Sequence, residues 1–386
     1  MANKKKRKKI KIQAFLVKPF LICLGVFMIG NILLPTREYS EVENRSLAKR
    51  PRLTLSSLQT GTFMEQYEDY LMDQFIGRNL LRDLKVRIDT FAGNKEENGV
   101  YRGKQGQLME DVVIPDQEVL KKNVKAIKEF AESNSGIPTS MILVPDAACI
   151  LEDELPSLAT VANQRTMIKS VKRELGESVS WVDAVSVLDT HKNEKVYYKT
   201  DHHWTTLGAY YVFQESGSAL GVQSKEESTF SPYAVTTTFN GTLSSKSGYE
   251  ENEKEEIDIY TPQGEDLDVV VNYVQEQKKT TSLYDSTKLD TKDKYAVFLG
   301  GNYSLLDIKT TVNAKRKLLM FKDSYANCFI PFLTPYFREI VVVDPRYYTG
   351  DVSELVGTYN ITDCVFLYNA NTFFADNNIS GVLTGE

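Results

Sequence analysis

The residues of this chain that could do chemistry are concentrated in one segment, KTDHHWTTLGAYY, at positions 199–211. The chain has three histidines, and two of them, His202 and His203, stand side by side there. Asp201 precedes His203 by two positions, and in an extended segment side chains two apart point to the same side. A carboxylate in that place can hold an imidazole in the tautomer that a general base requires. The segment is therefore a candidate for half of a catalytic site.

A candidate nucleophile lies much later in the chain, in the segment KDSYAN at positions 322–327. The apolar run KLLMF at positions 317–321 predicts a strand. Ser324 follows this strand at the point where we expect a helix to begin. Its hydroxyl would then lie at the carboxyl end of a strand, beside backbone N–H groups that have no helical partner. A serine in that position can attack a carbonyl carbon if an imidazole takes its proton.

The residues by themselves leave other interpretations open. Two histidines and an aspartate are chemically adequate metal ligands, although neighbouring side chains diverge in an extended chain and His191 has no regular ligand spacing to the pair. The segment is also compatible with a structural corner before a helix, and Ser324 with a helix N-cap. We expect no metal and no cofactor at this site.

Further residues are candidates for binding the reacting groups. The Ser324 N–H is one predicted oxyanion donor, and the turn after a strand expected at Tyr295–Leu299 offers two more, from Gly301 and Asn302. The side chains predicted to contact a substrate are those of Arg346, Trp204, Tyr325 and Tyr347. Each of these four also has an ordinary structural interpretation, a salt bridge for the arginine and burial for the rings.

The start of the chain differs in composition from the rest. Residues 1–36 contain eight Lys or Arg and no Asp or Glu, although the whole chain has a net charge of −6. Residues 14–35, with the apolar run FLICLGVFMIGNILL, predict a transmembrane signal-anchor, and the basic residues 1–13 predict a cytoplasmic tail. A cleaved signal peptide is the alternative. Residues 36–60 predict an extended linker, and the acidic body argues against a nucleic-acid partner.

The remaining residues, 61–386, are predicted to form one catalytic domain. Apolar strands alternate with amphipathic helices on either side of a region, residues 222–293, that is rich in Ser, Thr, Lys and Glu. Strand–helix–strand order is typical of an α/β domain in which a parallel sheet lies between two helical layers. Residues 222–293 are predicted to form an inserted β-rich lobe.

Two long segments closely resemble one bacterial family. KTDHHWTTLGAYY and LLMFKDSYANCFIPFLTPYFREIVVVDPRYY, at positions 318–348, are similar to the DHHW protein family. Shorter similarities are SEVENRSLAKRP (40–51), NGVYRG (98–103) and FLGGNYS (298–304). The family itself resembles a branch of the SGNH-hydrolase group that is related to the alginate O-acetylation enzymes.

The resemblance implies a flavodoxin-like SGNH-hydrolase fold and a triad of Ser324, His203 and Asp201. Lys322 stands where that group usually has the glycine of Gly-Asp-Ser, which is a departure from its pattern at this turn. The implied function is a single-pass, membrane-anchored extracytoplasmic serine O-acetyltransferase of the cell membrane. Its substrate would be a cell-surface polysaccharide, and a membrane-bound O-acyltransferase would supply the acetyl group. An O-acetylesterase and a non-catalytic polysaccharide-binding or assembly subunit are the alternatives.

Overall fold

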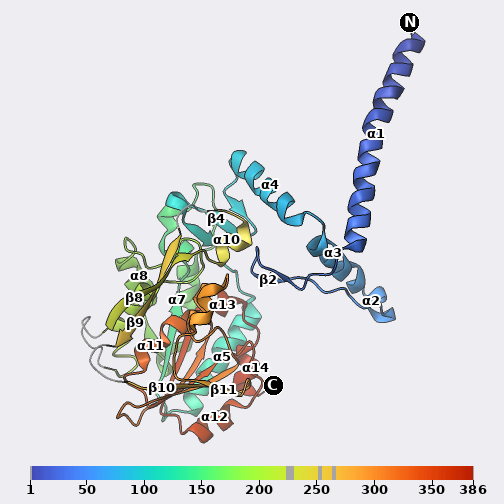
Figure 1. Ribbon diagram of the computed structural model, residues 1–386. Helices are drawn as coiled ribbons and strands as arrows, with labels where there is room; N and C mark the ends of the chain where they lie inside the picture. The colour runs from blue at the N-terminus through green and yellow to red at the C-terminus, as the bar shows by residue number, and fades with distance from the viewer. Residues whose placement is uncertain (1, 223–229, 251–253, 263–266, 386) are drawn as a thin grey trace. The chain divides into compact units, whose positions relative to one another are not determined.

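The computed structural model of the chain divides into two compact units, one ending at Gly93 and the other beginning at Asn94. The domain predicted at residues 61–386 is therefore divided, because its first part, up to Gly93, belongs to the first unit. The ribbon in Figure 1 is coloured along the chain. The residues that the structure describes are 2–222, 230–250, 254–262 and 267–385.

The first unit is mainly helical. The amphipathic pattern predicted from Thr62 onward forms two helices, α3 and α4, which are separated at Gly77, where φ is 74°. The stretch predicted as an extended linker contains the paired strands β1 and β2 and the helix α2. Among the described residues, no helix combines the length and the apolar character that crossing a bilayer requires. The elements are α1 (Ala2–Leu33), β1 (Tyr39–Ser40), β2 (Arg45–Ser46), α2 (Leu55–Gln59), α3 (Thr62–Gln74) and α4 (Arg78–Phe91).

An eight-stranded sheet forms the centre of the second unit, in the order β11-β10-β12-β14-β13-β15-β6-β7. From β14 to β7 all neighbours are parallel, as predicted. β12, β10 and β11 add antiparallel pairs at the other edge, so the sheet is mixed rather than parallel throughout. The strands are β6 (Thr139–Val144), β7 (Ser180–Val182), β10 (Val269–Tyr273), β11 (Lys278–Thr280), β12 (Leu305–Thr310), β13 (Lys317–Lys322), β14 (Glu339–Val343) and β15 (Asp363–Asn369).

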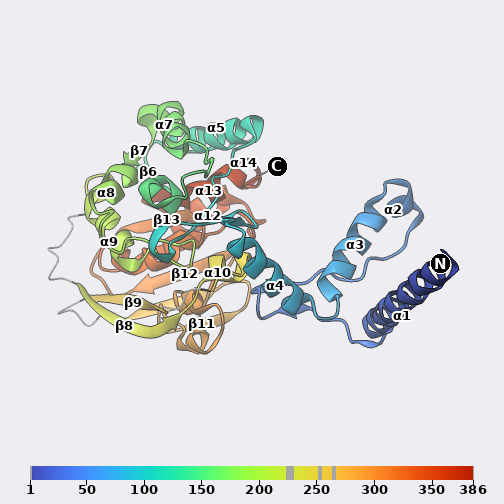
Figure 2. The same cartoon turned by 90° about the horizontal axis from the view of Figure 1, so that it is seen from above.

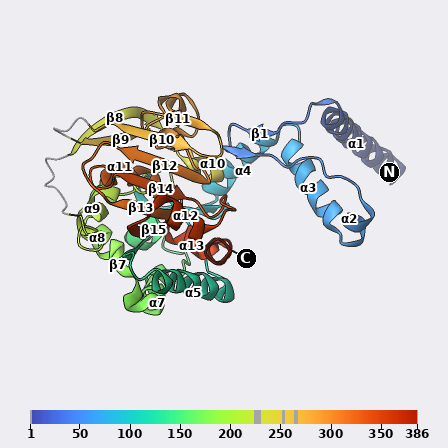
Figure 3. The same ribbon diagram turned by 90° about the horizontal axis from the view of Figure 1, so that it is seen from below.

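Helices cover both faces of this sheet, as predicted. Alternate residues of β13 belong to two separate apolar clusters, Leu318 and Met320 to one and Leu319 and Phe321 to the other. Figure 3 shows α9 and α11 on one side of the sheet and α12 and α13 on the other. The helices of the two layers are α5 (Gln117–Ser133), α6 (Ala147–Ile150), α7 (Gln164–Leu175), α8 (Ala184–Thr190), α9 (Thr206–Glu215), α11 (Ile330–Leu333), α12 (Val352–Tyr359), α13 (Ala370–Ala375) and α14 (Ile379–Thr384).

The region predicted as an inserted β-rich lobe is divided between two structures. β8 (Phe230–Phe239) and β9 (Glu255–Pro262) pair as an antiparallel ribbon outside the main sheet (Figure 2), whereas β10 and β11 extend the main sheet itself. The short helix α10 (Thr242–Ser247) lies between β8 and β9. Parts of the predicted lobe, residues 223–229, 251–253 and 263–266, lie outside the described residues.

The second unit also contains a small sheet and short 3-10 helices. β3 (Glu96–Glu97), β4 (Val100–Arg102) and β5 (Leu108–Glu110) form a three-stranded antiparallel sheet. The strand predicted at Tyr295–Leu299 is instead a short 3-10 helix, η6 (Lys294–Val297). That prediction was wrong because a short apolar run does not distinguish a buried strand from a buried helical turn.

Candidate active site

Ser324 lies at the carboxyl end of β13, the strand between β14 and β15, and begins the short helix η7 (Ser324–Cys328). The turn is fixed by the carboxylate of Asp323, which is fully buried. One of its oxygens accepts the Tyr325 N–H at 2.9 Å and the other accepts the Asn369 N–H at 2.9 Å. Asp323 therefore ties the serine turn to the end of the neighbouring strand β15, and the serine side chain is left half-buried.

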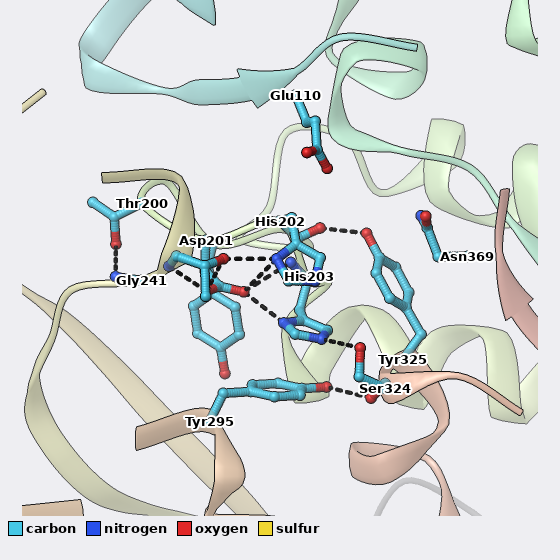
Figure 4. Close-up of polar contacts among 12 residues, drawn as sticks. Glu110, Thr200, Asp201, His202, His203, Gly241, Tyr295, Ser324, Tyr325 and Asn369 are labelled. Atoms are coloured by element: carbon cyan, nitrogen blue, oxygen red, sulfur yellow. Dashed lines mark hydrogen bonds and ion pairs between the residues drawn. The ribbon is translucent and has the colours of Figure 1, made fainter. Parts of the chain in front are cut away.

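The structure brings Ser324 together with His203 and Asp201 (Figure 4). The distance from His203 Nε2 to Ser324 Oγ is 2.7 Å, and that from His203 Nδ1 to Asp201 Oδ1 is 2.6 Å. The same carboxylate oxygen accepts the backbone N–H of His203 at 3.0 Å, which fixes the turn between the two residues. Asp201 and His203 are 1% and 5% exposed, so water does not compete for these bonds.

The other oxygen of Asp201 is held by the region that was predicted to be an inserted lobe, residues 222–293. Thr242, the first residue of α10, donates its N–H at 2.7 Å and its hydroxyl at 2.9 Å to Asp201 Oδ2. Gly241 precedes it in close contact, since a Cβ there would lie 2.2 Å from the Asp201 Cβ. Glu255 of β9 accepts the N–H groups of Lys199 and Thr200, each at 2.8 Å. The β8–β9 region therefore positions the segment that carries Asp201.

The pKa values of Asp201 and His203 are shifted by their burial and by the charged and hydrogen-bonding groups next to them. Burial alone would raise the pKa of the Asp201 carboxyl, but His203, His202 and the bonds from His203 and Thr242 outweigh it and hold that pKa well below its usual range. Burial, together with the neighbouring His202, lowers the pKa of His203 to about 4, although Asp201 opposes this change. An ionised carboxylate beside a neutral imidazole is the state in which His203 can accept a proton.

Two aromatic residues predicted to contact a substrate are buried instead. Trp204 is completely buried, and its indole N–H donates to the Tyr325 carbonyl at 2.9 Å. Tyr325 is also completely buried, and its hydroxyl donates to the His202 carbonyl. Both predictions were wrong, because these side chains link the histidine segment to the serine turn from inside and present no surface to a ligand.

The predicted oxyanion donors are arranged differently from expectation. The Ser324 N–H is at the first position of η7, where a helix has no internal acceptor for it. The Gly301 N–H donates to the Phe298 carbonyl at 3.2 Å, which closes a turn in which Gly301 has φ 119°. Gly301 is therefore not a free donor. Asn302 is exposed, and its side-chain oxygen is engaged by Lys322.

Lys322, which stands where the resemblance implies a glycine, is completely buried at the end of β13. Its ammonium donates to Asn302 Oδ1 at 2.7 Å and to Asn327 Oδ1 at 2.9 Å, and it lies 3.8 Å from Asp344 Oδ2. Burial lowers the pKa of Lys322 to about 8, and Asp344 opposes that change. The Lys322 side chain thus links Asn302, the helix η7 and Asp344, the residue that follows β14.

The last two predicted substrate residues follow β14. Arg346 forms a two-point ion pair with Asp344, with Nε at 2.8 Å and Nη2 at 2.7 Å, so the salt-bridge interpretation of this residue is correct. Desolvation opposes its charge, but the bond to Asp344 and the carboxylate's charge raise the pKa of Arg346. Tyr347 is 53% exposed, with the Arg346 guanidinium 5.4 Å from its ring centre. A role in substrate binding remains a prediction for both.

A metal ion would have to compete with the hydrogen bonds of this site. Asp201, His202 and His203 offer ligand atoms that all lie within 4.8 Å of one another. Both Asp201 oxygens already accept two donors each, and His203 uses one nitrogen for Asp201 and the other for Ser324. These residues fit a proton-transfer chain better than they fit a metal centre.

Sequence reasoning missed three residues of the site. Thr242 was assigned only to the insertion, and Tyr295 only to a strand. The Tyr295 ring stacks on the His203 imidazole, with ring centres 3.7 Å apart and planes 12° apart. Asn369 ends β15, and its amide donates to the buried Asp146 at 2.9 Å. A polar residue at the end of a strand next to β13 was the signal available for Asn369.

The fold and the site together define the class: an α/β protein that presents a Ser–His–Asp chain at the carboxyl end of a central parallel strand. A family model described as "DHHW protein" matches residues 118–343. The match covers more than half of the sequence, so the chain belongs to the DHHW protein family. A search of curated proteins found no match.

Several solved structures are similar to this chain. A DHHW family protein from Eubacterium siraeum is 27% identical, with a TM-score of 0.64 over 75% of this chain and 96% of the other. PatB1 of Bacillus cereus, solved with a sulfonyl adduct, is 21% identical, with a TM-score of 0.59 over 72% of this chain and 97% of the other. The O-acetyltransferase domain of Pseudomonas putida AlgJ is 14% identical, with a TM-score of 0.44 over 75% of this chain and all of the other, 100%.

Proposed function

We propose that this chain is a serine O-acetyltransferase that modifies a cell-surface polysaccharide through an acetyl-serine intermediate. The observation that carries the proposal is the continuous hydrogen-bonded chain from Asp201 through His203 to Ser324, with bonds of 2.6 and 2.7 Å. Such a chain lets an imidazole remove the serine proton as the serine attacks.

In the first half of the proposed reaction, Ser324 Oγ attacks the carbonyl carbon of an acetyl donor. Its proton moves to His203 Nε2, and Asp201 stabilises the imidazolium through the bond to Nδ1. The carbonyl oxygen becomes an oxyanion, for which the N–H of Ser324 is the donor that the turn geometry favours. His203 then returns the proton to the leaving group, and the acetyl group remains on Ser324.

In the second half, a sugar hydroxyl takes the place of the leaving group. His203 Nε2 accepts the hydroxyl proton, the sugar oxygen attacks the acetyl carbon, and the bond from that carbon to Ser324 Oγ breaks. The proton on His203 then returns to Ser324 Oγ. If water attacks instead of a sugar, the same steps give an esterase.

We prefer transfer to hydrolysis because we propose that the protein is anchored in a membrane. The apolar stretch FLICLGVFMIGNILL and the basic residues before it support an anchor at residues 14–35, with the catalytic unit outside the cytoplasm. An acetyl group made in the cytoplasm would then reach Ser324 through a membrane-bound O-acyltransferase partner. The likeness to PatB1 concerns the fold alone, and transfer of an acetyl group by this chain is our proposal.

The proposal is tested with the purified full chain and p-nitrophenyl acetate. We expect a burst of p-nitrophenol equal to the enzyme concentration, and intact-mass analysis of quenched enzyme should find one acetyl group on the peptide that contains Ser324. Since sulfonyl fluorides react with activated serines, the same peptide should be sulfonylated when such a reagent is used. A chain that is neither acetylated nor sulfonylated at Ser324, yet binds polysaccharide in calorimetry, would be a binding subunit instead.

A further inference from the structure

The first of the paired histidines, His202, has a defined place beside the reaction centre that the proposed mechanism does not use. The His203 imidazole lies between two rings, Tyr295 with its centre 3.7 Å away and His202 with its centre 3.9 Å away and tilted by 37°. Figure 4 shows Tyr295 and His202 on opposite sides of His203. The Tyr295 side is closed, since that residue is 4% exposed, whereas the His202 side chain is 29% exposed.

The hydrogen bonds of Thr242 determine which nitrogen of His202 carries a proton. The Thr242 hydroxyl has one hydrogen, which it donates to Asp201 Oδ2 at 2.9 Å. The distance between that hydroxyl oxygen and His202 Nδ1 is 2.7 Å. The hydroxyl can only accept in this second bond, so His202 Nδ1 carries the hydrogen and, in the neutral ring, Nε2 is an acceptor.

The remaining nitrogen, His202 Nε2, points away from Thr242 because the two ring nitrogens lie on different sides of the imidazole. Within the described part of the chain, Nε2 has no hydrogen-bond partner. An acceptor on a partly exposed side chain is thus held next to the imidazole that would take the proton of the attacking hydroxyl. Water brings only its attacking oxygen to this place, but a sugar brings a second hydroxyl on the adjacent carbon.

We infer that His202 is a specificity-determining residue that binds the acyl acceptor, with Nε2 accepting a hydrogen bond from the hydroxyl next to the one that attacks. The acceptor class is therefore a carbohydrate carrying vicinal hydroxyl groups. This inference rests on the proposed function and deepens it, because it explains how the acetyl group reaches a sugar in preference to water. The proton of the attacking hydroxyl still goes to His203, and His202 neither gains nor loses a proton in the reaction.

The test is a competition for the acetyl-enzyme between two matched acceptors, trans-1,2-cyclohexanediol and cyclohexanol, with p-nitrophenyl acetate as donor. The ratio of the diol monoacetate to cyclohexyl acetate, halved because the diol has two equivalent hydroxyl groups, measures acceptor preference per hydroxyl and is independent of how fast Ser324 is acetylated. We expect the full-length wild type to prefer the diol roughly fivefold, the effect of one hydrogen bond. His202→Asn keeps a donor where Nδ1 was and removes the acceptor at Nε2, so its ratio should fall to about one, whereas His202→Gln places an amide oxygen near Nε2 and should retain part of the preference.

The outcomes separate the inference from the proposed function. A wild-type chain that forms no acetyl-Ser324 overturns both. A wild type that is acetylated but shows no preference for the diol, or a His202→Asn variant that keeps the full preference, overturns the inference alone. A direct measurement is ¹⁵N NMR, with the His202 signals assigned by their loss in His202→Asn. The neutral His202 ring should carry its proton on Nδ1, as the carboxylate partners of His203 and His191 also require of those rings, and a neutral His202 ring protonated at Nε2 would overturn the inference.

Discussion

The two sides of the His203 imidazole are built in different ways. On the carboxylate side, Asp201 comes from the same short segment and is held by direct bonds from His203 and Thr242. On the serine side, Ser324 belongs to a distant part of the chain and rests on a layer in which the buried Lys322 joins Asn302, Asn327 and the end of β14. The base thus takes its carboxylate partner from its own segment, which Thr242 also holds, whereas the nucleophile depends on packing between strands.

The largest effect should come from removing the nucleophile. Ser324→Ala leaves the imidazole and the carboxylate in place but removes the atom that accepts the acetyl group. We expect kcat/KM for p-nitrophenyl acetate to fall by about 10⁶-fold, as for other serine enzymes that act through such a chain. Ser133→Ala, at an exposed position of α5, is the matched control and should be unchanged. Substantial turnover by the Ser324→Ala variant would exclude the acetyl-serine route.

Substitution of the carboxylate that binds His203 should reduce activity less than removal of the nucleophile. Asp201→Asn keeps the shape of the side chain but presents an amide where His203 Nδ1–H needs an acceptor, so the imidazole is held in the wrong tautomer. We expect the rate constant of the p-nitrophenol burst, which reports acetylation of Ser324, to fall roughly 10⁴-fold. If the loss is below about tenfold, Asp201 is a structural residue and the comparison between the two sides is incorrect.

The pH dependence tests how well burial isolates the base. His203 must be neutral to accept the Ser324 proton, and its pKa is lowered to about 4 by burial and by His202. Activity should therefore stay constant from neutral pH down to about pH 5. It should then decline as the pH falls through 4, approaching about tenfold per pH unit below that value. A kcat/KM profile with its midpoint near 6.5 would mean that His203 is open to water in solution.

The smallest effect should come from removing the buried ammonium group of Lys322, which contacts Asn302 and Asn327. Lys322→Met removes the donor shared by Asn302 and Asn327 and leaves their side-chain oxygens under-satisfied. We expect the free energy of unfolding to fall by about 2 kcal/mol in urea titrations and kcat to fall roughly tenfold. Lys125→Met, at an exposed position of α5, controls for loss of positive charge. An unchanged kcat with reduced stability would restrict Lys322 to holding the fold.

The parts of the site that were predictable are those specified over a few residues. Asp201 and His203 are two apart, and Ser324 directly follows a strong strand pattern, so local geometry was enough to select them. The alternation of strands with helices likewise predicted the parallel part of the sheet. The antiparallel edge was not predictable, because β10 and β11 lie in a region rich in Ser, Thr, Lys and Glu, and the sequence does not show that β10 pairs with β12 and β11 with β10.

The errors share a physical cause. Trp204 and Tyr325 flank reactive residues in the sequence, and a ring in such a place packs inward or faces a ligand according to what covers it in three dimensions. Thr242 could not be linked to Asp201 either, since the contact joins segments that are 41 positions apart. The sequence also does not show that the Gly301 N–H, a predicted oxyanion donor, closes a turn onto the Phe298 carbonyl.

The bond between His203 and Ser324 spans 121 positions, and the threonine that clamps Asp201 also follows it in the chain. During synthesis or export, a nascent chain that has emerged only through α9 already carries the histidine, but neither the clamp nor the serine. The Asp201–His203–Ser324 chain can therefore be complete only when the polypeptide has emerged at least as far as η7 and the sheet has closed around β13. Assembly of the site is in this way coupled to synthesis of nearly the whole second unit.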